Sequence, residues 1–298
     1  MSGAPTPKLI ALDGNGTLLK GDGTTISEYT RDVILQVQAR GIPVVLVTGR
    51  SLDKARPMLE RAGMQQYAIT ENGARAVVIE DGSLLYELWI DGPVAAAPVR
   101  AIKEKFPSRC FFVQLTKVGG WIESTHPWLA DDAEDATREG ALKMFVKQVP
   151  ELETALLEEV GVQCAKSYVT VPDSTDFAAT MAEIKSAVGE GWAMREIKQL
   201  LPGIRNTCEV QSISVNKADG LAGLCRTLGV PLENVWAFGD DHNDVRMLSE
   251  MGWGVRMANH VPAIASVGKD VTPFSNDDDG VAKYLEEWIL KARDGEAS

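Results

Sequence analysis

The chain has 298 residues, of which 45 % are hydrophobic and 24 % are charged, which is ordinary for a globular protein of one large or two average domains. Its formal net charge of −12 argues against nucleic acid or an anionic membrane as a partner. No apolar run approaches the roughly 20 residues of a membrane span, residues 1–7 do not resemble a secretion signal, and the cysteines form no C-x-x-C pair. We therefore expect free thiols and a cytoplasmic protein.

The first third of the chain alternates between strand-like and helix-like segments. Apolar runs of strand length, bounded by turn residues, are followed by segments whose apolar residues recur at helical spacing. The expected strands are 9–12, 42–47 and 67–70, and the expected helices are 27–40 and 52–62. A hairpin around Asp81-Gly82 follows. This alternation predicts an α/β fold that begins with a parallel sheet.

From about Trp89 the pattern changes to a mixture of strands and helices. The expected strands are 110–115, 121–123, 163–171, 192–197 and 208–212, and the expected helices are 93–106, 137–149, 151–160 and 175–188. This stretch has the length of an ordinary domain. We therefore predict an inserted α+β domain over residues 89–212, and a core domain built from residues 1–88 and 213–298.

The α/β pattern resumes after the insertion. The expected helices are 217–228, 245–249, 262–266 and 281–290, and the expected strands are 235–238, 252–256 and 270–272. Together with the first third of the chain, these elements predict a Rossmann-like, doubly wound parallel sheet.

Asp13 ends the first expected strand and is followed by the turn Gly14-Asn15-Gly16. Ligands of open α/β sheets lie at the carboxyl ends of the strands, so Asp13 stands where a nucleophile would be placed. A carboxylate can attack phosphorus and form an aspartyl-phosphate. The alternative is an aspartate that only opens a loop.

Two other strand ends carry suitable chemistry. Thr48-Gly49 offers a hydroxyl and free backbone N–H groups that suit a phosphate oxygen, although Thr48 could also be a simple helix cap. The run 239–244, Gly-Asp-Asp-His-Asn-Asp, places carboxylates at a strand end, and carboxylates are the ligands Mg²⁺ takes in proteins. The alternative for this run is a solvated acidic loop.

In their order and spacing, these segments resemble the motifs of the Cof-type phosphatases of the haloacid dehalogenase-like superfamily. The resemblance covers nearly the whole chain. The matching segments are 13–19, 47–50, 71–74, 215–217, 239–244, 254–259 and 279–282. It implies a Rossmann-like core with an inserted α+β cap domain that selects the substrate.

The resemblance also implies a role for each matched residue. The implied catalytic residues are Asp13 as nucleophile, Lys217 as the group that offsets phosphoryl charge, and position 15, here Asn15. The implied substrate-binding residues are Thr48, Gly49, Arg50, Asn72 and Asn243. The implied Mg²⁺ ligands are Asp13, the backbone carbonyl of Asn15, Asp240 and Asp244.

Asn15 departs from the family pattern, which has a second aspartate there as general acid and base. An amide cannot exchange a proton in that way, and such proton transfer typically contributes about 10²–10⁴-fold to the rate. Asparagine is nearly isosteric with aspartate, so we expect folding and substrate binding to survive while hydrolysis slows. Asn15 is either an introduced substitution that traps a ligand or a native residue, and the sequence leaves both open.

The leading prediction is a Mg²⁺-dependent phosphatase that hydrolyses a small phosphomonoester, a sugar phosphate by analogy. A catalytically silent phosphoester-binding protein with the same pocket is the alternative. A carbon–halogen hydrolase fits less well, because the run 239–244 suits a metal. Cap residues that could face the substrate, with no preference among them, are Arg109, Lys117, Glu123, His126 and Arg195.

Overall fold

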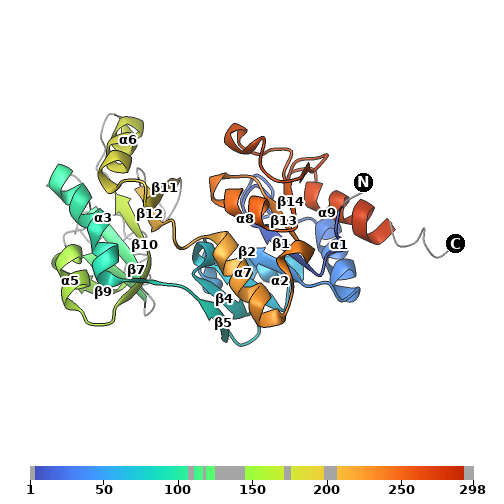
Figure 1. The fold of residues 1–298 in the computed structure, drawn as a ribbon, viewed down its shortest axis with the longest axis horizontal. Coiled ribbons are helices and arrows are strands. Elements are labelled where there is room, and N and C mark those ends of the chain that lie inside the picture. Colours follow the sequence, from blue (N-terminus) through green and yellow to red (C-terminus); the bar gives the residue numbers. More distant parts are fainter. Residues whose placement is uncertain are drawn as a thin grey trace. The chain divides into compact units, whose positions relative to one another are not determined.

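The computed structural model describes residues 4–106, 111–116, 119–124, 145–170, 176–197 and 207–291. The chain divides into two compact units, which Figure 1 draws with their elements labelled. The core unit comprises Met1–Leu88 with Asn216–Ser298, and the inserted unit comprises Trp89–Val215. Among the described residues, no helix combines the length and the apolar character that crossing a bilayer requires.

The core unit is built on one sheet in the order β15-β14-β13-β1-β2-β3-β4-β5. The strands are β1 (Leu9–Asp13), β2 (Val44–Val47), β3 (Tyr67–Thr70), β4 (Arg75–Val78), β5 (Leu84–Glu87), β13 (Val235–Gly239), β14 (Trp253–Arg256) and β15 (Asp270–Val271). Neighbours from β15 to β3 are parallel, and β4 and β5 continue as an antiparallel hairpin. The carboxyl ends of β13, β1, β2 and β3 therefore meet at one edge.

Both faces of this sheet are buried, as a doubly wound fold requires. Ile10 and Leu12 of β1 pack with residues of α1, α2 and α9, whereas Leu9 and Ala11 pack with residues of α7 and α8. The helices are α1 (Glu28–Ala39), α2 (Leu52–Ala62), α7 (Lys217–Leu228), α8 (Val245–Glu250) and α9 (Gly280–Leu285), the last continuing as a π-helical turn, η6 (Glu286–Lys291). Short 3₁₀ turns are η1 (Glu71–Gly73), η3 (Leu232–Asn234), η4 (His242–Asp244) and η5 (Pro262–Ile264). The prediction of an α/β core is confirmed.

The inserted unit is a mixed sheet in the order β11-β12-β10-β7-β8-β9, with β6 beside β10. Its elements are β6 (Ile90–Asp91), α3 (Gly92–Lys105), β7 (Phe111–Thr116), β8 (Gly119–Glu123), β9 (Phe145–Val149), α5 (Leu152–Glu158), β10 (Gln163–Thr170), α6 (Phe177–Val188), β11 (Trp192–Ile197) and β12 (Thr207–Ser212). The unit is α+β, as predicted.

One expected element was wrong in its described part. We expected a helix over 137–149, but Phe145–Val149 forms β9, which pairs with β8 in parallel. A short run with apolar residues fits a strand or a helix equally well by periodicity, and pairing with β8 decides between them. Residues 137–144 lie outside the described part of the chain.

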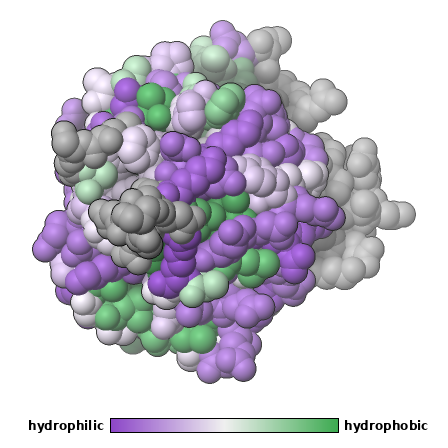
Figure 2. Space-filling model, turned by 90° about the vertical axis from the view of Figure 1, so that its right-hand side faces the viewer, coloured by the Kyte–Doolittle hydropathy of each residue, from purple (hydrophilic) through white to green (hydrophobic). Residues whose placement is uncertain are grey.

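Figure 2 shows a face on which hydrophilic residues predominate and hydrophobic residues form only small patches between them.

Candidate active site

The predicted site residues of the core unit gather at the carboxyl edge of the sheet. Asp13 is the last residue of β1, and Thr48 directly follows β2. Asn72 lies in η1 after β3, and Asp240 follows β13. Lys217 is the first residue of α7. Although they are far apart in the sequence, these residues are brought to one edge because four parallel strands end there.

Lys217 joins two of the carboxylates. Its ammonium group donates to Asp13 Oδ1 and, at 2.6 Å, to Asp244 Oδ1. The side chain of Lys217 is only 1 % exposed. Burial alone would lower the pKa of Lys217, but the two carboxylates outweigh burial and raise it. The lysine therefore stays protonated and supplies a fixed positive charge beside Asp13.

Two features fix the start of α7 and thereby place Lys217. Asn216 is the N-cap, and its side chain accepts a hydrogen bond from the backbone N–H of Asp219 at 3.0 Å. The turn η1 lies directly against this cap, because a Cβ on Gly73 would come within 1.9 Å of the carbonyl oxygen of Asn216. Gly73 also has a φ of +104°, so a side chain is excluded there by space and by backbone conformation.

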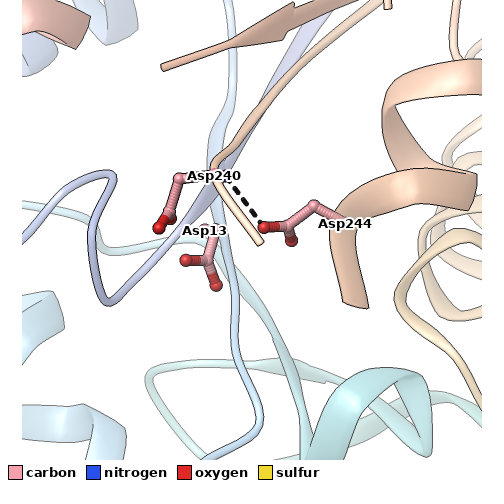
Figure 3. A group of neighbouring side chains, drawn as sticks. All are labelled: Asp13, Asp240 and Asp244. Atoms are coloured by element: carbon pink, nitrogen blue, oxygen red, sulfur yellow. Dashed lines mark hydrogen bonds between the residues drawn. The ribbon is translucent and has the colours of Figure 1, made fainter. Parts of the chain in front are cut away.

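Three carboxylates converge at this edge, as Figure 3 shows. Asp13, Asp240 and Asp244 each offer an oxygen, and these oxygens lie within 4.8 Å of one another. Asp244 Oδ2 accepts from the backbone N–H groups of Asp240 at 3.0 Å and Asp241 at 3.1 Å, which ties the loop together. Thr17 donates from Oγ1 to Asp240 Oδ1 at 2.9 Å.

The single positive charge of Lys217 does not balance the negative charges of Asp13, Asp240 and Asp244. Burial, followed by the negative charges of Asp13 and Asp244, raises the pKa of Asp240 to about 8. Burial also raises the pKa of Asp13 to about 6, with Lys217 opposing it and Asp244 adding to it. A hard divalent cation with a preference for oxygen would remove this deficit, so the residues present fit a Mg²⁺-type ion.

The predicted substrate-binding residues form a second group beside Asp13. The backbone N–H of Asn72 donates to the carbonyl oxygen of Thr48 at 3.0 Å, and Asn243 Nδ2 donates to Asn72 Oδ1 at 3.3 Å. A Cβ on Gly49 would lie 2.8 Å from Asn72 Oδ1, so only glycine permits this approach. Thr48 is 3 % exposed, and its hydroxyl accepts from the backbone N–H of Arg50 at 3.2 Å.

Arg50 contacts the residue that departs from the family pattern. Its guanidinium donates from Nη2 to Asn15 Oδ1 at 2.8 Å and to the carbonyl oxygen of Gly23 at 3.3 Å. Burial lowers the pKa of Arg50, whereas the charge of Asp13 opposes this effect, so Arg50 also interacts electrostatically with Asp13. The motifs do not predict the contact of Arg50 with Asn15, because none of them pairs position 50 with position 15.

Two further polar contacts of the site were also missed. Thr17 holds Asp240, as described above, and Asn259 Nδ2 donates to the carbonyl oxygen of Gly16 at 2.8 Å. Both residues lie within segments that matched the family, so the signal was present in the sequence. The hydrogen-bond partner of each side chain depends on which loops are adjacent in the folded protein, and the sequence does not show which loops are adjacent.

Of the cap residues considered from the sequence, Arg109, Lys117 and His126 lie outside the described residues. Glu123 binds Lys103 at 2.6 Å and accepts from the backbone N–H of Leu152 at 3.0 Å, so its carboxylate holds the start of α5. Arg195 lies 3.6 Å from Glu209, which also pairs with Lys166 at 2.7 Å.

Comparison with known proteins agrees with this geometry. The profile of a haloacid dehalogenase-like hydrolase family matches residues 10–285. The chain belongs to this family. The recognition of the superfamily from the motifs is therefore confirmed, and the chain is a hydrolase.

Individual relatives are distant but extend over nearly the full chain. The 5-amino-6-(5-phospho-D-ribitylamino)uracil phosphatase YcsE of Bacillus subtilis is 27 % identical over 288 residues, which covers 95 % of this chain and 96 % of the relative. A superfamily phosphatase from Bacteroides thetaiotaomicron has a similar solved structure, with a TM-score of 0.69 at 23 % identity over 96 % of this chain and 97 % of that one. A subclass IIB sugar phosphatase aligns with a TM-score of 0.68 at 18 % identity over 94 % and 98 %.

Proposed function

We propose that this hydrolase is a Mg²⁺-dependent phosphatase that acts on small phosphorylated metabolites through an aspartyl-phosphate on Asp13. The observation that carries the proposal is the setting of Asp13. Its carboxylate accepts from Lys217, and β1 pairs Asp13 with Val47, the residue directly before Thr48 and Gly49. A nucleophile, a cation and phosphate-binding groups at one strand edge are the parts that phosphoryl transfer to a carboxylate requires.

Each residue of the site has its own role in the proposed reaction. A carboxylate oxygen of Asp13 attacks phosphorus, while Lys217 and the Thr48 hydroxyl stabilise the charge on the phosphoryl oxygens. Asp13 and Asp240, with Asp244 and the backbone carbonyl of Asn15, would hold the divalent cation. When bound, that cation supplies further charge compensation and orients the phosphoryl group.

The substrate class rests on similarity. The relatives named above include phosphatases of a phosphorylated ribitylaminouracil and of sugars. We propose a sugar phosphate as the substrate of a chain of this fold that has a proton donor at position 15. The inserted unit would select that substrate.

We also place the protein in the cytoplasm. This agrees with Cys164, Cys208 and Cys225, which are buried free thiols; Cys110 lies outside the described residues.

A catalytically silent phosphoester-binding protein is the second candidate, and Asn15 is the observation that favours it. The amide at position 15 accepts from Arg50 and has no proton to transfer. The site would then bind a phosphoester without turning it over.

Phosphate release from a panel of sugar phosphates in Mg²⁺ separates the two candidates, with the chain compared with its Asn15→Asp variant. We expect the Asp form to be faster by about 10²–10⁴-fold, because it regains general acid–base catalysis. Equal rates would show that position 15 is not the acid–base site. Tight binding without phosphate release from either form would favour the binding protein.

A further inference from the structure

Arg50 fixes the orientation of Asn15. Because Arg50 Nη2 donates to Asn15 Oδ1 at 2.8 Å, the end of the amide left for a substrate is Nδ2. That group donates hydrogen bonds but does not release a proton. Asn15 lies two positions after Asp13, and the charge of Asp13 acts on Arg50, so the contact of Arg50 with Asn15 lies near Asp13.

Several other titratable side chains at this edge are already bound by neighbouring residues or belong to the carboxylate cluster. Asp240 and Asp244 belong with Asp13 to the cation-binding cluster, and Lys217 is bound by two carboxylates. His242 has a side chain that is 70 % exposed, and its ring nitrogen lies 2.7 Å from the carboxylate of the preceding residue.

Asp22 is a further carboxyl group near Arg50, because it precedes Gly23, whose carbonyl oxygen accepts from Arg50. It accepts hydrogen bonds from the backbone N–H groups of Thr24 at 2.8 Å and Thr25 at 2.7 Å, and from the Thr25 hydroxyl. These hydrogen bonds, the Thr25 hydroxyl first, lower the pKa of Asp22 to about 2. Asp22 is therefore ionised at neutral pH and holds no proton for a leaving group.

Building on the proposed function, we propose that this chain acts on phosphoryl compounds whose leaving group departs as a stable anion, namely acyl phosphates or phosphoanhydrides. An oxygen of Asp13 bonds to phosphorus as the bond from phosphorus to the leaving oxygen breaks. The electron pair stays on that oxygen, which leaves as a carboxylate or a phosphate and needs no proton. An alkoxide is a much stronger base and needs a proton as it departs, which the amide of Asn15 cannot give.

The second half of the reaction also lacks a proton acceptor at position 15. The oxygen of water attacks phosphorus, the bond from phosphorus to the Asp13 oxygen breaks, and its electron pair returns to the Asp13 carboxylate. The phosphate product carries away the protons of the water. Because no base assists the attack, this step is slow, and the leaving group should appear in a burst of about one per chain before steady turnover.

The test compares the chain with Asn15→Asp, a nearly isosteric variant, in Mg²⁺. Release of the leaving group is followed by rapid quench with four kinds of donor: phenyl phosphates of decreasing phenol acidity, acetyl phosphate, ADP and glycerol phosphate. Thermal unfolding midpoints of both proteins confirm that each is folded.

For the chain itself we expect a burst with acetyl phosphate or ADP and a rate that falls steeply as the phenol becomes less acidic. Asn15→Asp should raise burst-phase release from glycerol phosphate by about 10²–10⁴-fold, a much larger factor than it gives with acetyl phosphate. A burst with acetyl phosphate alone assigns the acyl class, and a burst with ADP alone assigns the anhydride class.

Two results contradict the inference, and they can be told apart. If the acidity of the leaving group affects the rates of both proteins equally, the residue at position 15 does not control protonation of the leaving group, and only this inference fails. If neither protein releases a leaving group from any donor, the proposed function itself fails.

Discussion

Lys217 is the residue on which the charge balance of the site depends. It is buried between Asp13 and Asp244, so the positive charge that a phosphoryl group would meet is present before any ligand binds. Such preorganised charge needs no rearrangement during the reaction. Removing one partner of a buried ion pair leaves an uncompensated charge, which is more costly than the pair itself is favourable.

Lys217→Met should therefore lower the free energy of unfolding by about 3–5 kcal/mol and abolish phosphate release. Urea denaturation without divalent cations measures the stability. The matched control is Lys20→Met, because Lys20 pairs with Asp279 at 3.4 Å near the surface and its loss should cost no more than about 1 kcal/mol. Equal losses in the two variants would contradict the role of Lys217 as a buried counter-charge.

At the scale of elements, the site depends on loops that approach each other closely. The turn η1 lies against the first turn of α7, and this contact connects the strand end that carries Asn72 to the helix that carries Lys217. Glycine at position 73 is what permits the approach. A displacement of either element would move Lys217 relative to Asp13.

Gly73→Ala should destabilise the protein by more than about 2 kcal/mol and strongly reduce activity, because the new methyl group meets the Asn216 carbonyl and the backbone has a positive φ. The control is Gly229→Ala. Gly229 also has a positive φ of +66°, but nothing lies within 4 Å of its Cβ position, so only the cost of about 1–2 kcal/mol for the left-handed conformation should appear. Thermal unfolding and phosphate release measure both variants. Normal activity in Gly73→Ala would show that the contact does not position Lys217.

The sequence predicted the elements better than their contacts. Strands such as Leu9–Asp13 and Tyr67–Thr70 were readable, because buried parallel strands are nearly continuous apolar runs between turn residues. The strand Phe145–Val149 was not, since a short apolar run does not distinguish strand from helix. The contact of Arg50 with Asn15 was also out of reach, because it depends on how two loops from neighbouring strands fold over the sheet edge.

At the scale of the whole molecule, the carboxylate cluster of Asp13, Asp240 and Asp244 links folding stability to pH. The pKa of Asp240 is raised to about 8 and that of Asp13 to about 6, both above the ordinary value of 3.8. Between pH 4 and pH 8 the folded state therefore holds protons that the unfolded state has lost. From these two groups, the cation-free protein loses stability as the pH rises through this window.

Mg²⁺ should reverse this loss, because it binds the ionised carboxylates and displaces their protons. We expect the Mg²⁺-induced rise in the thermal unfolding midpoint to be small near pH 5 and to grow toward pH 8. Asp240→Asn is the control, and its response to Mg²⁺ should be much smaller at every pH. A Mg²⁺ effect that does not change with pH, or that is unaltered in Asp240→Asn, would contradict the assignment of the cluster.

Covalent labelling of Asp13 tests the central claim most directly. The chain is mixed with acetyl phosphate in Mg²⁺, quenched in acid, and its intact mass is measured beside that of Asp13→Asn. We predict a gain of one phosphoryl group on the chain, mapped to Asp13, and no gain on the variant. An unchanged mass for the chain and for Asn15→Asp with every phosphoryl donor tried, or the same gain on Asp13→Asn, would contradict an aspartyl-phosphate mechanism at Asp13.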